Sequence, residues 1–203
     1  MKITNKDILD MQDRYRAAFV NGLLGPKGVH LLGTRSQDGI DNLSIVSSAT
    51  HFGANPAIIG VLFRPDSVRR DSLENILVTN FFTLNTVTKN IFKQSHQTSA
   101  RYDREISEFD KVSLTSQSIH DFEAPFVKES FMKVGLSYLE HHEMKVNSTV
   151  LVLGRVELVE IPDGVVLEDG AINLNNYPSV VVQGLDSYYE RGEFLGKLPY
   201  AKP

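Results

Sequence analysis

Residues 42–50 read NLSIVSSAT, and their alternation of apolar and polar side chains predicts a β-strand. The apolar positions Leu43, Ile45 and Ala49 are expected on one face and the polar positions on the other. Serine is a mediocre strand residue, so these hydroxyls indicate either a solvated strand face or a surface that binds a polar ligand. The candidate ligand-binding residues of this strand are Asn42, Ser44, Ser47, Ser48, Ala49 and Thr50.

The segment that follows gathers positive charge at the expected start of a helix. Residues 57–63 are a continuous apolar run, which predicts a strand covered on both faces, and residues 64–72 then read RPDSVRRDS. A helix N-terminus attracts anions through its free N–H groups, and arginine adds planar contacts to phosphate-like oxygens. A surface loop of solvated charges is the alternative interpretation. The candidate anion-binding residues are Arg64, Ser67, Arg69, Arg70 and Ser72.

The rest of the chain predicts mainly strands. Thr4 and Asp7 resemble a capping box, which predicts a helix that ends at Gly22. The apolar face of this helix is formed by Ile8, Met11, Tyr15, Ala18 and Phe19. Further helices are expected from Asp71 to Leu77 and from Lys89 to Ala100. Further strands are expected at residues 29–34, 81–87, 127–138, 150–161 and 179–183.

About seven strands with few intervening helices predict a mainly β protein with α-helical additions. Because helices do not regularly separate the strands, a doubly wound parallel sheet is disfavoured and an antiparallel barrel, closed or partly open, is favoured. The length of 203 residues fits a single domain over residues 1–203, with residues 1–22 as an N-terminal helical extension.

Composition excludes several classes of function. The net charge of −4 argues against nucleic acid and anionic membranes as partners, and no apolar run is long enough to span a membrane. The chain has no cysteine, which excludes disulfides and thiolate chemistry. The N-terminus lacks the apolar region of a secretory signal, so a cytoplasmic protein is expected.

The histidines predict no metal site. His141 and His142 are adjacent on an expected strand, so their side chains face opposite ways and cannot easily bind one ion. His96 lies in the segment Gln94 to Ser99, where lining a site and a structural role are both compatible with the sequence. No Ser-His-Asp constellation can be argued from spacing alone.

Taken in order along the chain, these motifs resemble the flavin reductase-like, FMN-binding split-barrel family. The segments that carry the resemblance are Asp38-Gly39, Asn42 to Ser48, Asn55-Pro56, Arg64-Pro65, Arg70-Asp71-Ser72, Asn75-Ile76, Phe82 to Asn85, Ser107 to Asp110, Ala124-Pro125, Gly184-Leu185 and Tyr188-Tyr189. The resemblance runs from about residue 20 to residue 200, and the ordered set is more specific than any single motif.

The resemblance implies a six-stranded split β-barrel with Greek-key character and a homodimer that holds FMN across its interface. It places Ser47 and Ser48 by the flavin ring and ribityl chain. It places Arg64, Ser67, Arg70 and Ser72 by the phosphate. The loop from His96 to Arg101, which includes Ser99, is expected to cover the site.

The resemblance further implies an FMN-dependent oxidoreductase reduced by NADH or NADPH, with the chemistry at flavin N5. Free flavin, a metal complex or a redox partner protein would receive the electrons. Many reductases of this family carry Gly-Asp-His on a late strand, where this chain has Gly154-Arg155-Val156. This difference keeps three alternatives open: a non-catalytic FMN electron carrier or flavin-binding module, a pyridoxamine-phosphate-oxidase-like enzyme, and a binding protein without flavin.

Overall fold

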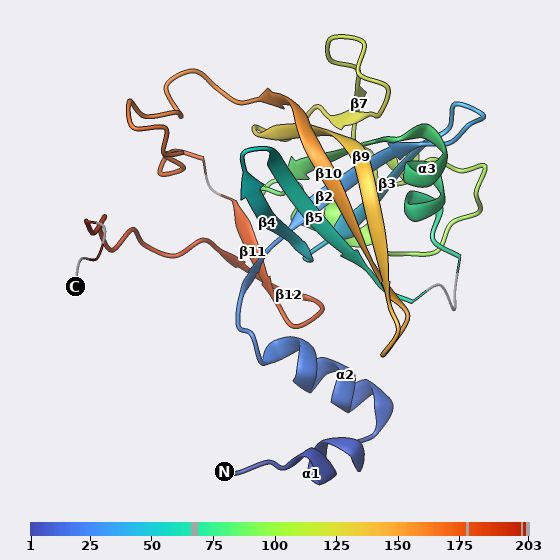
Figure 1. The fold of residues 1–203 in the computed structure, drawn as a ribbon, viewed down its shortest axis with the longest axis vertical. Coiled ribbons are helices and arrows are strands. Elements are labelled where there is room, and N and C mark those ends of the chain that lie inside the picture. Colours follow the sequence, from blue (N-terminus) through green and yellow to red (C-terminus); the bar gives the residue numbers. More distant parts are fainter. Residues whose placement is uncertain (66–68, 178, 200, 202–203) are drawn as a thin grey trace.

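A seven-stranded antiparallel sheet forms the centre of the fold (Figure 1). The computed structural model describes residues 1–65, 69–177, 179–199 and 201. The sheet order is β3-β2-β6-β9-β10-β5-β4. Its strands are β2 (His30–Arg35), β3 (Asp41–Val46), β4 (Ala49–Ala54), β5 (Ala57–Phe63), β6 (Phe81–Thr86), β9 (Lys133–Met144) and β10 (Thr149–Glu160).

Smaller elements surround this sheet. The helices are α1 (Asn5–Leu9), α2 (Asp13–Gly22), α3 (Asp71–Thr79), α4 (Phe92–Gln97) and α5 (Glu108–Val112). A three-stranded sheet has the order β1-β11-β12, with β1 (Lys27–Gly28), β11 (Val180–Gln183) and β12 (Ser187–Glu190). A further pair joins β7 (Ser116–Gln117) to β8 (Phe126–Val127). Within the described residues no helix is long and apolar enough to cross a membrane.

The two-residue connection between β3 and β4 shows that the main sheet is curled. These strands lie at opposite edges of the sheet order, yet only Ser47 and Ser48 separate them in the chain. Two linking residues span at most about 10 Å, so the two edges must approach each other. The sheet is therefore a split barrel, and the prediction of a mainly β barrel is confirmed.

The prediction of one continuous strand over residues 42–50 was wrong. The chain leaves β3 at Ser47 to reach the other edge of the sheet, and this break also resets the alternation. Leu43 and Ile45 pack in one hydrophobic core, whereas Ala49 packs against another. The same break explains why the sheet has seven strands where the resemblance implied six.

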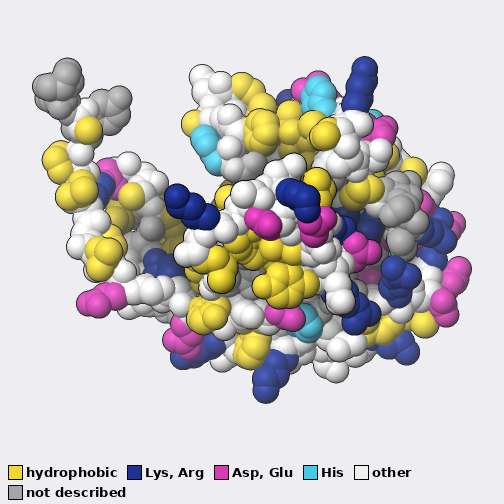
Figure 2. All heavy atoms as spheres, turned by 90° about the horizontal axis from the view of Figure 1, so that it is seen from below, with side chains coloured by type: hydrophobic (Ala, Val, Ile, Leu, Met, Phe, Trp, Pro, Cys, Tyr) yellow, Lys and Arg dark blue, Asp and Glu magenta, His cyan; other side chains and the backbone are white. Residues whose placement is uncertain are grey.

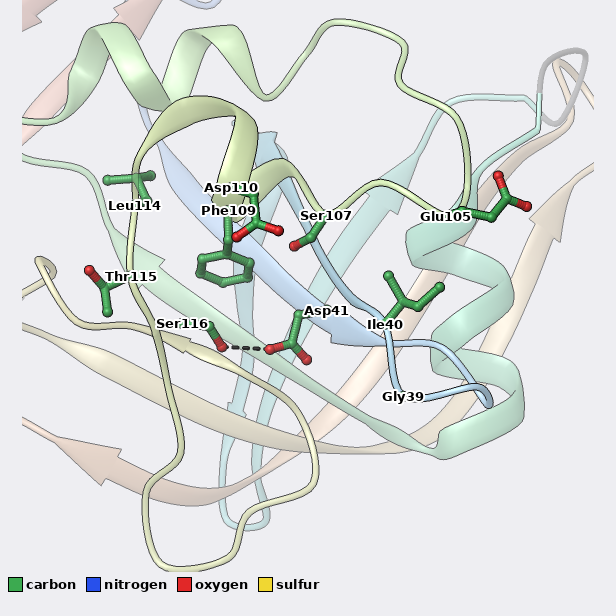
Figure 3. A pocket seen from close by; sticks show the side chains of 10 residues that line it. All are labelled: Gly39, Ile40, Asp41, Glu105, Ser107, Phe109, Asp110, Leu114, Thr115 and Ser116. Atoms are coloured by element: carbon green, nitrogen blue, oxygen red, sulfur yellow. Dashed lines mark hydrogen bonds between the residues drawn. The ribbon is translucent and has the colours of Figure 1, made fainter.

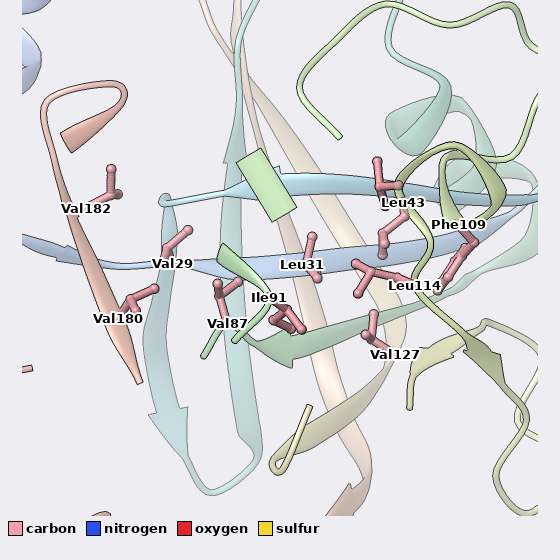
Figure 4. Packing of buried hydrophobic residues seen from close by; sticks show 11 residues of the cluster. Val29, Leu31, Leu43, Val87, Ile91, Phe109, Leu114, Val127, Val180 and Val182 are labelled. Carbon is pink, nitrogen blue, oxygen red and sulfur yellow. The ribbon is translucent and has the colours of Figure 1, made fainter. Parts of the chain in front are cut away.

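Two hydrophobic cores lie on the two faces of the curled sheet. In β2, Leu32 belongs to the core inside the barrel and its neighbour Leu31 to the core outside, as the period-2 alternation of a strand requires. Figure 4 shows the outer core, where Leu31 and Leu43 meet residues of α5 and β11. Helix α3 adds Leu73 and Ile76 to the inner core and lies at one end of the barrel (Figure 1).

The N-terminal helices stand away from the barrel (Figure 1). The predicted capping box is present, because the backbone N–H of Thr4 donates to the Asp7 carboxylate over 2.7 Å. The single helix expected here is instead two, α1 and α2, and neither contains a buried residue. The apolar face seen in the sequence is therefore not packed on the body of its own chain.

Three other elements differ from expectation. The helix predicted over residues 89–100 is only α4, because the hydroxyls of Ser95 and Thr98 bond backbone carbonyls and compete with helix continuation. The strand predicted over 127–138 is β9 at Lys133–Met144, because Val127 pairs instead with β7. Strand β5 is not covered on both faces, since Leu62 is exposed on the outside of the barrel.

A buried histidine gives folding a defined pH dependence. His30 lies at the start of β2, and its Nδ1 has no hydrogen-bond partner among the described residues. Burial lowers the pKa of His30 from 6.5 to about 4, so the unfolded chain binds the proton more readily. We expect the unfolding free energy to be complete above pH 6.5 and to fall by roughly 3 kcal/mol as the pH drops to 4.

Urea unfolding of the wild type and of a His30→Gln variant across this pH range tests the expectation. The variant lacks the titrating imidazole, so its stability should change less between pH 6.5 and pH 4. Identical slopes in the two proteins would show that His30 does not carry the effect.

Candidate functional site

A polar cluster joins β3 to the first turn of α3. The amide nitrogen of Asn42 donates to the Ser72 hydroxyl over 2.9 Å, and the hydroxyls of Ser44 and Ser72 lie 2.9 Å apart. Asn42 also reaches Thr34, which accepts a second bond from Asn75 of α3. The structure thus brings together the two segments that the sequence singled out, residues 42–50 and 64–72. Part of the bonding capacity of Asn42 and Ser44 serves to hold α3 against the barrel.

The start of α3 keeps anion-binding capacity. Arg70 is its N-cap residue and makes no side-chain capping bond, and the Arg70 Nε is buried with no hydrogen-bond partner in the described residues. Arg69 lies 3.1 Å from Asp71 and 3.5 Å from Glu74, so the two acidic side chains of this turn already offset its charge. Arg64 is exposed just beyond β5, and Ser67 lies outside the described residues.

The connection between β3 and β4 presents polar groups at the seam of the barrel. Ser47, Ser48 and Ala49 are half-buried there, and Thr50 is exposed. The hydroxyl of Ser48 donates to the backbone carbonyl of Leu62 over 2.7 Å, which ties the connection to β5. These backbone and hydroxyl groups lie at the rim rather than in the interior of the barrel.

Helix α4 places His96 near β12 and lies against β3. The His96 Nδ1 is 2.9 Å from the Tyr188 hydroxyl, and the two rings meet edge to face with centroids 5.6 Å apart. Burial and the charge of Asp186 raise the pKa of Tyr188, so its phenol keeps a proton to donate to Nδ1. Ser99, whose hydroxyl bonds the His96 carbonyl, and Arg101 are both exposed beyond this helix.

Glu108 is a contact of β3 that sequence reasoning did not single out. Its carboxylate accepts the backbone N–H of Leu43 over 2.9 Å from the first turn of α5. Burial raises the pKa of Glu108, although the hydrogen bond from Leu43 acts in the opposite direction. Only the tertiary fold pairs these residues, because they lie 65 positions apart in the chain.

Two hollows of the structure lie beside the predicted site. Figure 3 shows an open hollow of about 500 Å³ between the Gly39–Asp41 turn, α5 and Leu114–Ser116, in which Asp41 accepts a bond from Ser116 over 2.6 Å. The other, of about 540 Å³, is bordered by Pro65, α3 and the tip of the β9–β10 hairpin. Neither hollow is lined by a residue predicted to bind the ligand.

The comparisons with known proteins agree with this architecture. A solved structure from Shewanella frigidimarina, assigned as a flavin reductase with a split-barrel domain, is 43% identical and covers 99% of this chain and all of its own, with a TM-score of 0.94. Component B of nitrilotriacetate monooxygenase from Bacillus cereus shares the fold at 19% identity and a TM-score of 0.84, covering 97% of this chain and 98% of its own.

A protein from Aquifex aeolicus whose function is not characterised is 28% identical over 160 residues, which are 78% of this chain and 81% of the relative. Residues 24–180 match the model of the flavin reductase-like domain family. This match spans most of the chain and includes the hydroxyl-bearing strands, the arginine-bearing turn and the barrel that joins them. The chain therefore belongs to the flavin reductase-like domain family, whose members are flavin-related oxidoreductases.

Proposed function

We propose that this chain binds FMN and uses it as an NAD(P)H-dependent oxidoreductase. Membership of the flavin reductase-like family supports a flavin cofactor. Two solved structures of similar fold are an FMN-binding protein from Thermus thermophilus and the flavoredoxin of Desulfovibrio vulgaris. The observation that carries the choice of a phosphorylated flavin is the buried, unpartnered Arg70 Nε at the uncapped start of α3.

The residues of the site fit such a ligand. Arg70 would hold the phosphate together with the free N–H groups of the first turn of α3, while Arg64 adds charge from the end of β5. Backbone and hydroxyl groups of Ser47 to Thr50 would bond the edge of the ring. When bound, FMN supplies hydride acceptance at N5, so the protein contributes orientation and electrostatics.

The proposed assembly is a homodimer with the flavin near its interface. The predicted ligand residues lie at the rim of the barrel and line neither of the two hollows, so one chain offers only part of an enclosing site. Phe52 and Leu62 remain exposed on the outside of β4 and β5, which gives a second copy an apolar surface beside the Ser47–Ser48 connection.

A second candidate function is a non-catalytic FMN electron carrier. The strand that carries Gly-Asp-His in many relatives here carries Arg155, whose guanidinium lies 2.7 Å from the Glu157 carboxylate. A paired arginine cannot supply the missing imidazole on the nicotinamide side. A pyridoxamine-phosphate-oxidase-like activity is less favoured, because Arg104 and Arg155 each pair with a glutamate and lie on different elements.

Spectroscopy of the purified protein tests these proposals in sequence. We expect FMN to be present after purification or to bind when added, with a visible flavin spectrum. Under anaerobic conditions NADH or NADPH should then bleach the bound flavin. Bleaching by dithionite but by neither nicotinamide would favour the electron carrier. A protein that stays colourless after added FMN would refute the flavin site itself.

A further inference from the structure

Both ends of the chain carry apolar side chains that their own molecule leaves uncovered. We call residues 1–24 the N-terminal arm and residues 191–199 the C-terminal arm. Leu24 of the first is 82% exposed, and Leu195 and Leu198 of the second are 98% and 88% exposed. Figure 1 shows both arms extending away from the barrel, and Figure 2 shows hydrophobic side chains along the C-terminal arm.

The N-terminal arm has the pattern of a helix that is meant to pack. Tyr15 and Phe19 lie one turn apart on α2, and Leu23 follows a further turn along the same face. Tyr15 and Leu23 are exposed, although such a stripe normally faces a core. Helices as short as α1 and α2 are marginal in water without a packing partner. The arm therefore needs a surface that its own chain does not supply.

Both arms leave the molecule from the same small sheet. Helix α2 leads into β1, the C-terminal arm follows β12, and β11 joins these two strands in the order β1-β11-β12. Val180 and Val182 fix β11 in the outer core, so the roots of both arms are anchored. One partner placed beside this sheet can meet both arms at once.

The barrel offers a matching surface on its outside. On β5 the inward positions Val61 and Phe63 belong to the inner core, so Leu62 between them points outward. Leu62 is 42% exposed and Phe52 on β4 is 49% exposed. The Phe52 ring lies over Gly60, where an added Cβ would come within 2.5 Å of it, so the ring has a fixed place on this outer face.

We propose that each terminal arm packs on a second copy of this chain, with the N-terminal arm lying on the outer β4–β5 face of that copy. In a two-fold symmetric pair, one chain supplies both the apolar arms and the apolar face, so each copy covers the other and the contact closes. The similar structure from Shewanella frigidimarina aligns over 99% of this chain, which includes the arm. The inference rests on the homodimer proposed above and identifies the segments that form it.

Sedimentation equilibrium of the full-length protein is the first test. We expect the wild type to be a dimer and the Tyr15→Asp/Leu24→Asp variant to dissociate about 100-fold more readily, since a few buried apolar anchors dominate such interfaces. Val146→Asp is the matched control, because Val146 is 91% exposed at the β9–β10 hairpin tip and lies in neither arm. A monomeric wild type, or a double variant that dimerises like the control, would overturn the proposal.

Disulfide cross-linking is the second test, and the absence of native cysteine makes it clean. A tagged Tyr15→Cys protein is mixed with an untagged Leu62→Cys protein, so any tagged-to-untagged disulfide joins two chains. We expect this product to form in high yield and the Tyr15→Cys plus Val146→Cys mixture to give little. Equal yields from both mixtures would exclude the β4–β5 face as the site of the arm.

Both tests are run with flavin removed and again with FMN added. Arm packing requires no cofactor, so cross-linking in a protein that never binds FMN would keep this inference and reject the flavin site. Conversely, a flavin-bound monomer without cross-links would reject the arms and leave the cofactor proposal standing.

Discussion

An Arg70→Ala variant is expected to bind FMN about 10- to 100-fold more weakly than the wild type, because one charge-assisted phosphate contact contributes roughly 1.5–3 kcal/mol. Arg70 is the N-cap of α3, and its buried Nε has no partner among the described residues. Its guanidinium is therefore available for a phosphate. Titration of the flavin-free protein with FMN, followed by quenching of flavin fluorescence, gives the dissociation constants.

Arg69→Ala is the control for Arg70. This neighbour is already committed to Asp71 and Glu74, so its removal takes away charge but breaks surface ion pairs of small energetic value. Binding should fall by only a few-fold. Riboflavin, which lacks the phosphate, should bind the wild type and Arg70→Ala alike. Equal losses at Arg69 and Arg70 would show that net charge, and not a phosphate contact, governs binding.

A Gly33→Ala variant is expected to lose about 3 kcal/mol or more of unfolding free energy through overpacking. An alanine Cβ at this position of β2 would lie 2.3 Å from the Pro125 backbone carbonyl oxygen and 2.6 Å from the Thr83 hydroxyl. That hydroxyl donates to the same carbonyl over 2.6 Å, so the strand and the loop would have to separate. Urea unfolding at neutral pH measures the loss.

Gly22→Ala provides the comparison. Gly22 ends α2, and an added Cβ there meets nothing within 4 Å, so the change should leave stability within about 0.5 kcal/mol. If Gly33→Ala accumulates only as insoluble protein, the milder Thr83→Ser change, which keeps the hydroxyl, should remain soluble and close to wild type. A Gly33→Ala protein as stable as Gly22→Ala would show that the loop at Pro125 yields easily.

The sequence identified most elements because each has a local signature. The continuous apolar run at residues 57–63 gave β5, and the apolar spacing of residues 73–76 gave the buried side of α3. It also identified both halves of the polar cluster, since hydroxyls in a strand and arginines before a helix are unusual locally. It failed over residues 42–50, because alternation does not reveal where a chain crosses from one sheet edge to the other.

Other parts of the candidate site had no local signal. Glu108 meets the Leu43 N–H, and Tyr188 meets His96, across 65 and 92 positions of the chain. Neither residue is unusual for its own segment, so only the packing of α5 and β12 onto the outer core makes them neighbours of β3 and α4. The role of His96 in binding stays a prediction, although its orientation by Tyr188 is now defined.

The sequence by itself determined which side chains can enter the barrel and where positive charge gathers, because strand alternation and helix starts are local properties of the chain. Only the tertiary structure decided how they are used. Closure of the sheet turned Asn42 and Ser44 towards Ser72, and the packing of α3 left the Arg70 Nε without a partner in the described residues. Burial and pairing depend on segments that are distant in sequence, and no local pattern specifies which of them will meet.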